Sequence, residues 1–153
     1  MRLSRTILVI LALLLGSLSS KTEVVMADNT SPNPQEQTTR ATIDKFNDAF
    51  NRHDADGVAA LLTDDTIFED TSPAPDGRRV EGKAAVADFW RAWFAKNADA
   101  HFDAEDVIVS GNRATVLWIY RKIRNGQPWH IRGVDVFTVR DGKVAAKLAY
   151  VKG

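Results

Sequence analysis

Two turn signals, Asn125-Gly126 and Asp141-Gly142, restrict the folds open to this chain of 153 residues more than any other feature. Each signal lies between long segments in which apolar and polar residues alternate, and a period of two is typical of strands. Asn-Gly and Asp-Gly favour the type I′ turn, which joins antiparallel neighbours through two residues at positive φ. The signals therefore predict consecutive hairpins in the C-terminal part of the chain.

The alternating segments predict four long strands. They cover residues 102–109, 113–123, 129–139 and 143–151, with Ser-Gly-Asn between the first two and the dipeptide turns between the others. Strands that follow one another through such short turns pair with their neighbours in the sequence. The expected sheet is therefore a four-stranded antiparallel meander.

The residues before the meander show the three- and four-residue spacing of amphipathic helices. A first helix is predicted from Ile43, Phe46, Asn47 and Phe50, a second begins near Asp54 or Asp56, and a third covers residues 83–97. A short strand of β-branched and aromatic residues, 66–70, lies between the second and the third helix. Three helices ahead of a meander predict an α+β domain, in which the helices cover one face of a curved sheet and enclose a cavity.

The composition excludes several classes of protein. The 20 basic and 20 acidic side chains are interleaved along the chain, so no binding surface for nucleic acid is predicted. Cysteine is absent, which excludes disulfides, thiolate catalysis and thiolate metal sites. Since no histidine pair has metal-binding spacing and no glycine-rich phosphate loop is present, no metal or cofactor is expected.

The N-terminus has the order of a secretory signal, with basic residues, an apolar run over residues 7–15 and then small residues. The run is shorter than the roughly 20 residues that span a bilayer, so cleavage is expected instead of a stable membrane anchor. We place the cut before Asp28, with Ser20 as the competing site, and expect export to the periplasm or beyond. The predicted parts are a signal peptide (1–27), a flexible linker (28–37) and one domain (38–153).

Asp135 is the most informative ionisable residue. It shares its predicted strand face with Trp129 and Phe137, so a carboxyl group is expected on an apolar face. A buried acid needs a partner or takes up a proton. Two interpretations stay open: a structural Asp, bonded to a neighbouring strand or paired with an arginine such as Arg121, and a neutral acid that donates to a ligand oxygen.

Asp70 is the second candidate. It shares a strand face with Phe68 and directly precedes a Thr-Ser-Pro loop. From its position, Asp70 is interpreted as a strand-terminal residue that caps the next turn, which Asp does well.

Six short segments together resemble one known family. They are Phe-Asn-Arg-His-Asp-Ala-Asp-Gly (50–57), Leu-Leu-Thr-Asp-Asp (61–65), Phe-Glu-Asp (68–70), Gly-Lys-Ala-Ala (82–85), Val-Asp-Val-Phe (134–137) and Asp-Gly-Lys (141–143). The family is the NTF2-like superfamily, in its SnoaL-like and ketosteroid-isomerase-like branches. The resemblance covers residues 38–153 and implies an α+β cone of three helices on a curved, mainly antiparallel sheet. It implies no single activity, because this fold carries isomerases, dehydratases, cyclases, epoxide hydrolases and non-catalytic binding proteins.

The resemblance to ketosteroid isomerase implies roles for both acids, with Asp70 as the general base and Asp135 as a neutral donor to an oxyanion. The family's helix tyrosine, its main oxyanion donor, is replaced here by Phe46, and Tyr120 is the candidate for a substitute donor. The residues expected to line the apolar substrate-binding wall are Phe46, Phe68, Phe89, Trp118, Trp129 and Phe137.

The three histidines are less informative. His53 follows the first helix and is expected in solvent, and His130 has the parity opposite to Asp135, which places it outside the cone. His101 begins a strand and reaches the cavity only if that edge curls inward. Histidine-dependent dehydratase chemistry is therefore not expected.

These features lead to one hypothesis and one alternative. The hypothesis is an exported domain that binds a small apolar molecule and carries out isomerase-like proton transfer without a cofactor, cyclase and dehydratase chemistry being related options. The alternative is a non-catalytic module for ligand binding or dimerisation. Val134 and Val136 have the parity that faces away from the cone, so a homodimer through the outer sheet face is expected.

Overall fold

The computed structural model describes residues 33–152. The predicted signal peptide and the predicted linker up to residue 32 lie outside the described residues. The elements in chain order are α1 (Pro34–Asn51), α2 (Ala55–Ala60), β1 (Leu62–Glu69), β2 (Arg79–Glu81), α3 (Lys83–Lys96), β3 (His101–Ser110), β4 (Arg113–Arg124), β5 (Gln127–Arg140) and β6 (Lys143–Val151). Three helices and a six-stranded sheet confirm the predicted α+β class.

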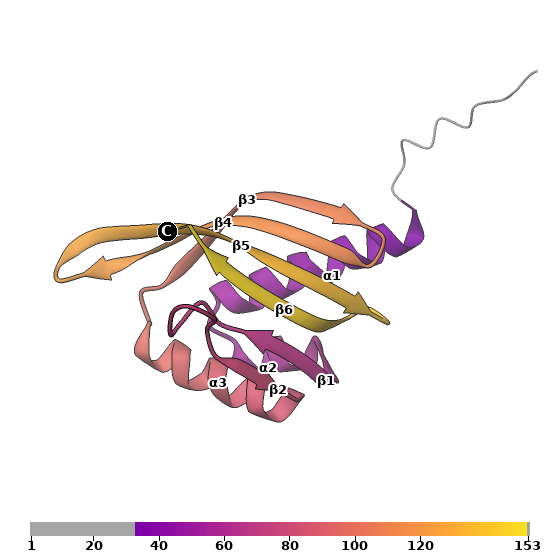
Figure 1. Cartoon of the computed structure of the whole chain (residues 1–153), viewed down its shortest axis with the longest axis horizontal. Coiled ribbons are helices and arrows are strands. Elements are labelled where there is room, and N and C mark those ends of the chain that lie inside the picture. The colour runs from indigo at the N-terminus through magenta and orange to yellow at the C-terminus, as the bar shows by residue number, and fades with distance from the viewer. Residues whose placement is uncertain (1–32, 153) are drawn as a thin grey trace, which may run out of the picture.

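The sheet has the strand order β2-β1-β6-β5-β4-β3 (Figure 1). The last four strands form the predicted meander, and all of their pairings are antiparallel. β1 adds to the other side of β6 in parallel orientation, and the short β2, which the sequence did not predict, pairs with β1. The parallel contact brings the end of β1 beside the middle of β6, although the two strands are far apart in the sequence.

The predicted hairpin turns are confirmed by their backbone angles. Asn125 and Gly126 have φ of 53° and 74°, and Asp141 and Gly142 have φ of 52° and 70°. Two successive residues at positive φ are the requirement of a type I′ turn. These turns set the register in which β4, β5 and β6 pair.

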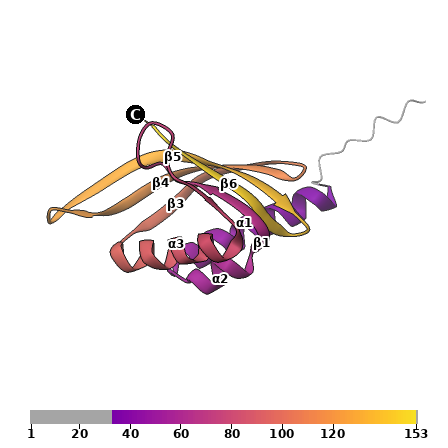
Figure 2. The same ribbon diagram turned by 60° about the horizontal axis from the view of Figure 1, so that its bottom comes forward.

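The helices all lie on one side of the sheet, and the β4–β5 hairpin extends beyond them (Figure 2). α1 begins at Pro34, four residues before the predicted domain boundary at residue 38, so the end of the predicted linker is helical. The reason is a capping box: Asn33 Oδ1 accepts from the Glu36 backbone N–H at 2.9 Å, and the Glu36 carboxylate accepts from the Asn33 N–H at 3.3 Å.

The core fills the space between the helices and the inner sheet face with aromatic rings. The Phe50 ring from α1 lies 4.8–5.0 Å from the ring centres of Trp90, Phe94 and Phe102. The Phe46 ring packs edge-on against Phe137 of β5 at 5.4 Å. Aromatic contacts of this kind add to the burial energy of the rings and hold α1 and α3 against the sheet.

A bulge in β6 decides which residues face the core. Val139 of β5 pairs with Val144 and Thr138 pairs with Ala146, so Ala145 is an extra residue in β6. β1 and the residue before it hold this place, because the Val144 N–H donates to the carbonyl of Leu61, directly ahead of β1, at 2.7 Å and the Val144 carbonyl accepts from Thr66 Oγ1 at 3.0 Å. After the bulge the alternation is reversed, and Lys147 faces inward beside Phe68 and Phe137.

Candidate functional site

A cavity of about 200 Å³ opens on the inner side of the sheet and is called the central cavity here. Its lining includes all three residues predicted to be catalytic: Asp70, Tyr120 and Asp135. The other lining residues are Phe68, Thr71, Ser72, Trp90, Trp93, Asn97, Phe102, Trp118, Lys122, Ile131, Lys147 and Ala149. Parts of the chain distant in sequence thus supply one mainly apolar chamber with a few polar groups, the usual composition of a small-molecule site.

Asp135 has a partner in this cavity. The Lys147 ammonium donates a hydrogen bond to Asp135 Oδ2 at 2.8 Å, and the side chains are 9% and 7% exposed, respectively. Asp135 pairs with Ala149 across β5 and β6, and Lys147 pairs with Phe137, so the two charged residues are diagonal neighbours on the inner face. The site is built around a buried ion pair.

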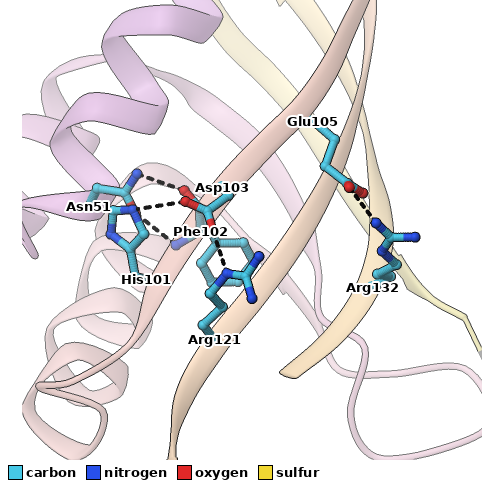
Figure 3. A network of polar contacts seen from close by, with 7 residues as sticks. All are labelled: Asn51, His101, Phe102, Asp103, Glu105, Arg121 and Arg132. Atoms are coloured by element: carbon cyan, nitrogen blue, oxygen red, sulfur yellow. Dashed lines mark hydrogen bonds and ion pairs between the residues drawn. The ribbon is translucent and has the colours of Figure 1, made fainter. Parts of the chain in front are cut away.

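This ion pair gives Asp135 a partner that the sequence did not predict. Because Oδ2 accepts from the Lys147 ammonium, this oxygen does not act as a hydrogen-bond donor in this arrangement. Arg121, the arginine suggested as partner, instead contacts Asp103 at 2.5 Å at the protein surface. Figure 3 shows Arg121 in a separate exposed network that also includes His101 and, further along the strands, the Glu105–Arg132 pair.

Lys147 is the functional residue that the sequence reasoning missed. Its ammonium lies 5.3 Å from the ring centre of Phe68, 5.7 Å from that of Phe137 and 5.8 Å from that of Trp90. Aromatic faces attract a cation through their quadrupole, and they do so more strongly where water is excluded. Regular alternation from Val144 would point Lys147 outward, so only the bulge at Ala145 could have revealed it.

Asp70 follows β1 directly and opens onto the central cavity. Its backbone N–H donates to the Arg78 carbonyl at 2.9 Å, which closes the loop between β1 and β2. Gly77, at φ 77°, passes so close that a Cβ would come within 1.7 Å of the Asp70 carbonyl oxygen. This loop therefore holds Asp70 at the sheet edge.

The environment of Asp70 favours its protonated form more than water does. Burial raises the pKa of Asp70 above its usual 3.8, while the Thr71 N–H, which donates to Asp70 Oδ1 at 2.8 Å, and the Lys147 charge partly oppose that rise. The negative charge of Asp135 adds to the rise. The interpretation of Asp70 as a turn cap is thus compatible with a second role, since one oxygen bonds the turn and the carboxyl group also lines the cavity.

Tyr120 lies on the inner face of β4 and its hydroxyl is 3.4 Å from Asn97 Oδ1. Burial, with a smaller contribution from the Asp99 charge, raises the pKa of Tyr120 to about 12. The phenol keeps its proton at neutral pH, and in this structure its one O–H donates to Asn97 Oδ1 at the cavity wall.

The predicted wall residues divide into two groups. Phe68 and Trp118 line the central cavity, and Phe46 lines a deep pocket of about 30 Å³ that shares Trp118, Asp135 and Lys147 with it. The other three do not line the central cavity. Phe89 packs beside Phe68 and Trp90, Phe137 is completely buried against Phe46, and Trp129 lies in a surface hollow on the hairpin that extends past the helices.

The histidines lie away from the cavity. His53 was expected in solvent, and this prediction is wrong. Its ring stacks on Phe94 at 5.0 Å between ring centres, and its Nε2 is 3.0 Å from the Ala100 carbonyl oxygen. His101 and His130 line the surface hollow that contains Trp129. Among residues 33–152, no cluster of three or more histidine and acidic side chains has the arrangement of a metal site.

In the described part of the chain, no helix has the length and apolar character needed to cross a membrane.

The sequence of residues 43–147 matches the family model of the SnoaL-like domain. No curated protein matches the chain.

Solved structures resemble the chain over most of its length. An NTF2-like protein of unknown function from Mesorhizobium loti is 34% identical, with a TM-score of 0.70, over 80% of this chain and 98% of that one. A provisionally named ketosteroid isomerase from Kribbella flavida is 21% identical (TM-score 0.62; 78% and 81% covered). A LEH-like epoxide hydrolase from M. tuberculosis is 20% identical (TM-score 0.64; 78% and 86% covered). The last two share the fold and carry the names of different reactions, and a fold by itself does not select a reaction.

Proposed function

The chain belongs to the SnoaL-like family of NTF2-like proteins, and from this premise we propose that it binds a small apolar molecule in the central cavity and catalyses proton transfer on it without a cofactor. The observation that carries the proposal is the meeting of Asp70, Tyr120 and the Asp135–Lys147 pair in one cavity. Perturbed acids that converge on a mainly apolar chamber are typical of acid–base sites.

Asp70 is the proposed base. Its carboxylate takes a proton from a carbon next to a ligand carbonyl, so that the C–H bond breaks, an O–H bond forms on Asp70 and the electron pair moves onto the carbonyl oxygen. Return of the proton to the same or another carbon completes exchange or isomerisation. The raised pKa of the Asp70 carboxyl suits this work, because a carboxylate of higher pKa is a stronger base.

The developing negative charge needs a donor, and Lys147 is the group that we propose for it. Asp135 accepts one N–H of the ammonium and so orients it, while the remaining N–H groups are available to a ligand oxygen. The protonated phenol of Tyr120 is the second proposed donor, and it takes this role when its O–H turns from Asn97 Oδ1 to the ligand oxygen. In this mechanism Asp135 is a positioning residue, and Lys147 takes over the donor role that the resemblance implies for Asp135.

The size of the cavity limits the substrate. Sites for drug-sized ligands measure roughly 300–1,000 Å³, and the central cavity has about 200 Å³. We therefore propose substrates with about one ring instead of a steroid nucleus.

Hydrogen–deuterium exchange tests the proposal. The protein is incubated in deuterated water with a panel of small cyclic ketones such as cyclohexanone, and loss of the protons next to the carbonyl is followed by NMR. Asp70→Asn is expected to lower the catalysed rate by about 10²- to 10⁴-fold. The matched control is Asp76→Asn, an exposed acid of the same loop that does not line the central cavity. Exchange no faster than in buffer for every ketone, or equal rates in wild type and Asp70→Asn, would contradict the catalytic part.

The second candidate is a non-catalytic ligand-binding module. Phe46 at the position of the family's helix tyrosine, with its ring packed on Phe137, favours it. This candidate predicts that small apolar molecules bind in the central cavity while no ketone exchanges its protons.

We also propose a homodimer through the outer sheet face. Leu117, Val134 and Tyr150 are direct neighbours across β4, β5 and β6, and they line an outer hollow of about 320 Å³. Tyr150 is 51% exposed, and the helices lie on the opposite side of the sheet. An apolar row that is partly exposed in this way is typical of a protein–protein contact.

Export is a separate proposal based on residues 1–27, and an intact mass that begins at Asp28 for protein recovered outside the cytoplasm would support it.

A further inference from the structure

Two buried polar atoms in the site have no hydrogen-bond partner among the described residues. They are the indole nitrogen Nε1 of Trp118 and the carboxylate oxygen Oδ1 of Asp135. Trp118 is 4% exposed and Asp135 is 5% exposed. Because most buried polar groups are paired, two orphans in one place indicate a group that comes from outside the chain.

The two residues are neighbours on the inner face of the sheet. Trp118 pairs with Gly133 across β4 and β5, and Asp135 lies two residues further along β5, which makes it the diagonal neighbour of Trp118. Both residues line the central cavity and the deep pocket behind it. One ligand group at the junction of these spaces is therefore placed to meet both.

The surroundings hold each orphan in position. A Cβ on Gly133 would come within 2.4–2.5 Å of two indole carbons of Trp118, so the ring lies directly over the glycine. Lys147 binds the other oxygen of the carboxylate, Asp135 Oδ2, at 2.8 Å. The site thus presents one fixed N–H donor and one fixed anionic acceptor.

We propose that Trp118 and Asp135 recognise a hydroxyl group of the ligand. The hydroxyl oxygen accepts from Trp118 Nε1–H, and its proton is donated to Asp135 Oδ1. A ketone oxygen satisfies only Trp118 and faces Asp135 as a second acceptor, a carboxylate adds repulsion between like charges, and an ammonium has no lone pair for the indole. A hydroxyl is the smallest common group that satisfies both atoms.

This inference rests on the proposed binding function and narrows its substrate class. The ligand is a small, mainly apolar ring that carries at least one hydroxyl, and a reactive carbonyl as well if the proton-transfer proposal holds. One water molecule is the competing occupant, because the deep pocket of about 30 Å³ is large enough to hold it.

The test uses three probes of similar shape: cyclohexanol, which donates and accepts, cyclohexanone, which only accepts, and methylcyclohexane, which does neither. Dissociation constants are measured by ¹H–¹⁵N NMR on the domain, with the Trp118 indole signal assigned by its absence in Trp118→Phe. We expect cyclohexanol to bind roughly 10-fold more tightly than methylcyclohexane, the effect of a hydrogen bond to a charged group, and to shift the Trp118 indole signal. Cyclohexanone is expected to bind more weakly than cyclohexanol.

Two variants and one control complete the test. Trp118→Phe keeps an aromatic ring and removes the donor, and Asp135→Asn keeps the shape and removes the charge, so each is expected to abolish most of the preference for cyclohexanol. Trp129→Phe removes an indole from the surface hollow outside the central cavity and is expected to keep both the binding and the preference. Should Asp135→Asn fail to fold, Trp118→Phe decides the outcome by itself.

Failure of the inference is distinguishable from failure of the proposed function. Equal binding of cyclohexanol and methylcyclohexane by the wild type would mean that water satisfies the pair, and it would overturn the hydroxyl inference while ligand binding stands. Absence of binding by all three probes would overturn both. Retention of the preference in Trp118→Phe would also overturn the assignment of the donor.

Discussion

The ammonium of Lys147 lies 2.8 Å from Asp135 Oδ2, and each side chain is more than nine-tenths buried. The two residues come from adjacent strands and meet beside three aromatic rings. A desolvated ion pair of this kind is a poor source of stability compared with apolar packing, but removal of one partner leaves a costly isolated charge. The pair therefore constrains both the stability and the chemistry of the cavity.

Lys147→Met is expected to destabilise the domain by about 3–5 kcal/mol, because Asp135 then stays buried without its partner. The double variant Lys147→Met/Asp135→Leu removes both charges and is expected to recover most of this loss. Urea unfolding followed by tryptophan fluorescence measures the free energies of unfolding. The control is Arg121→Met, whose ion pair with Asp103 is exposed and worth about 0–1 kcal/mol. Additive losses in the double variant would contradict the paired arrangement.

Asp70→Asn is expected to be more stable than the wild type at neutral pH. The pKa of Asp70 is raised in the folded state above 3.8, so ionisation costs more in the folded chain than in the unfolded chain. The wild type therefore loses stability as pH rises from about 3.8 through the folded pKa, and the loss stays constant above it. Asn at this position keeps an oxygen that accepts from the Thr71 N–H and does not titrate.

Thermal unfolding from pH 3.5 to 7.5 checks this expectation for Asp70. The gap between the melting temperatures of the variant and the wild type should widen with rising pH and then become constant. A gap that narrows with rising pH would mean that Asp70 is stabilised as a carboxylate, against the raised pKa.

Gly133→Ala is expected to destabilise the domain by at least about 1–3 kcal/mol, the usual cost of overpacking. The new Cβ would lie 2.2 Å from the Tyr150 carbonyl oxygen and 2.4 Å from the Trp118 ring. Trp118→Phe removes the ring atoms in question, so the loss in the double variant should be smaller than the sum of the single losses. Chemical unfolding of all four proteins measures this coupling, and strict additivity would show that the Trp118 ring does not lie over Gly133.

Val134→Lys is expected to weaken the proposed dimer by more than 10-fold, because it places a charge in the middle of the Leu117–Val134–Tyr150 row. The control is Ile123→Lys, which also replaces an aliphatic residue by a lysine. Ile123 is 54% exposed and lies near the tip of the β4–β5 hairpin. Sedimentation equilibrium gives the dissociation constants. A wild type that stays monomeric at all concentrations, or equal effects of both substitutions, would contradict an interface on this row.

Much of the fold could be predicted because its signals are local. The third helix was predicted over residues 83–97 and found at Lys83–Lys96, and the last predicted strand coincides with β6. The short β2 could not be predicted, since its three residues have no detectable period and form a strand only by pairing with β1. Capping likewise extended α1 to Pro34, where composition alone indicated a linker.

The candidate site was predicted in part for the same reason. Strand parity placed Asp135 on an apolar face of its strand, and the family resemblance assigned Trp118 and Tyr120 to the cavity, where the structure has all three as lining residues. Trp129 and Phe137 were expected in the same wall because they share the parity of Asp135. Parity carries no information on how far a hairpin extends past the helices or on which rings pack against one another, and these two features exclude both residues from the cavity.

The sequence by itself determined the α+β class, the hairpin turns and the inward side of β5, because turn chemistry and alternation depend on residues that are adjacent in the chain. Only the tertiary structure decided that Lys147 faces Asp135. That contact depends on the bulge at Ala145, which is fixed by bonds to Val144 from Leu61 and Thr66, more than 70 residues earlier. A local pattern cannot encode such a reversal, since the hydrogen bonds that stabilise it form only when β1 lies parallel to β6.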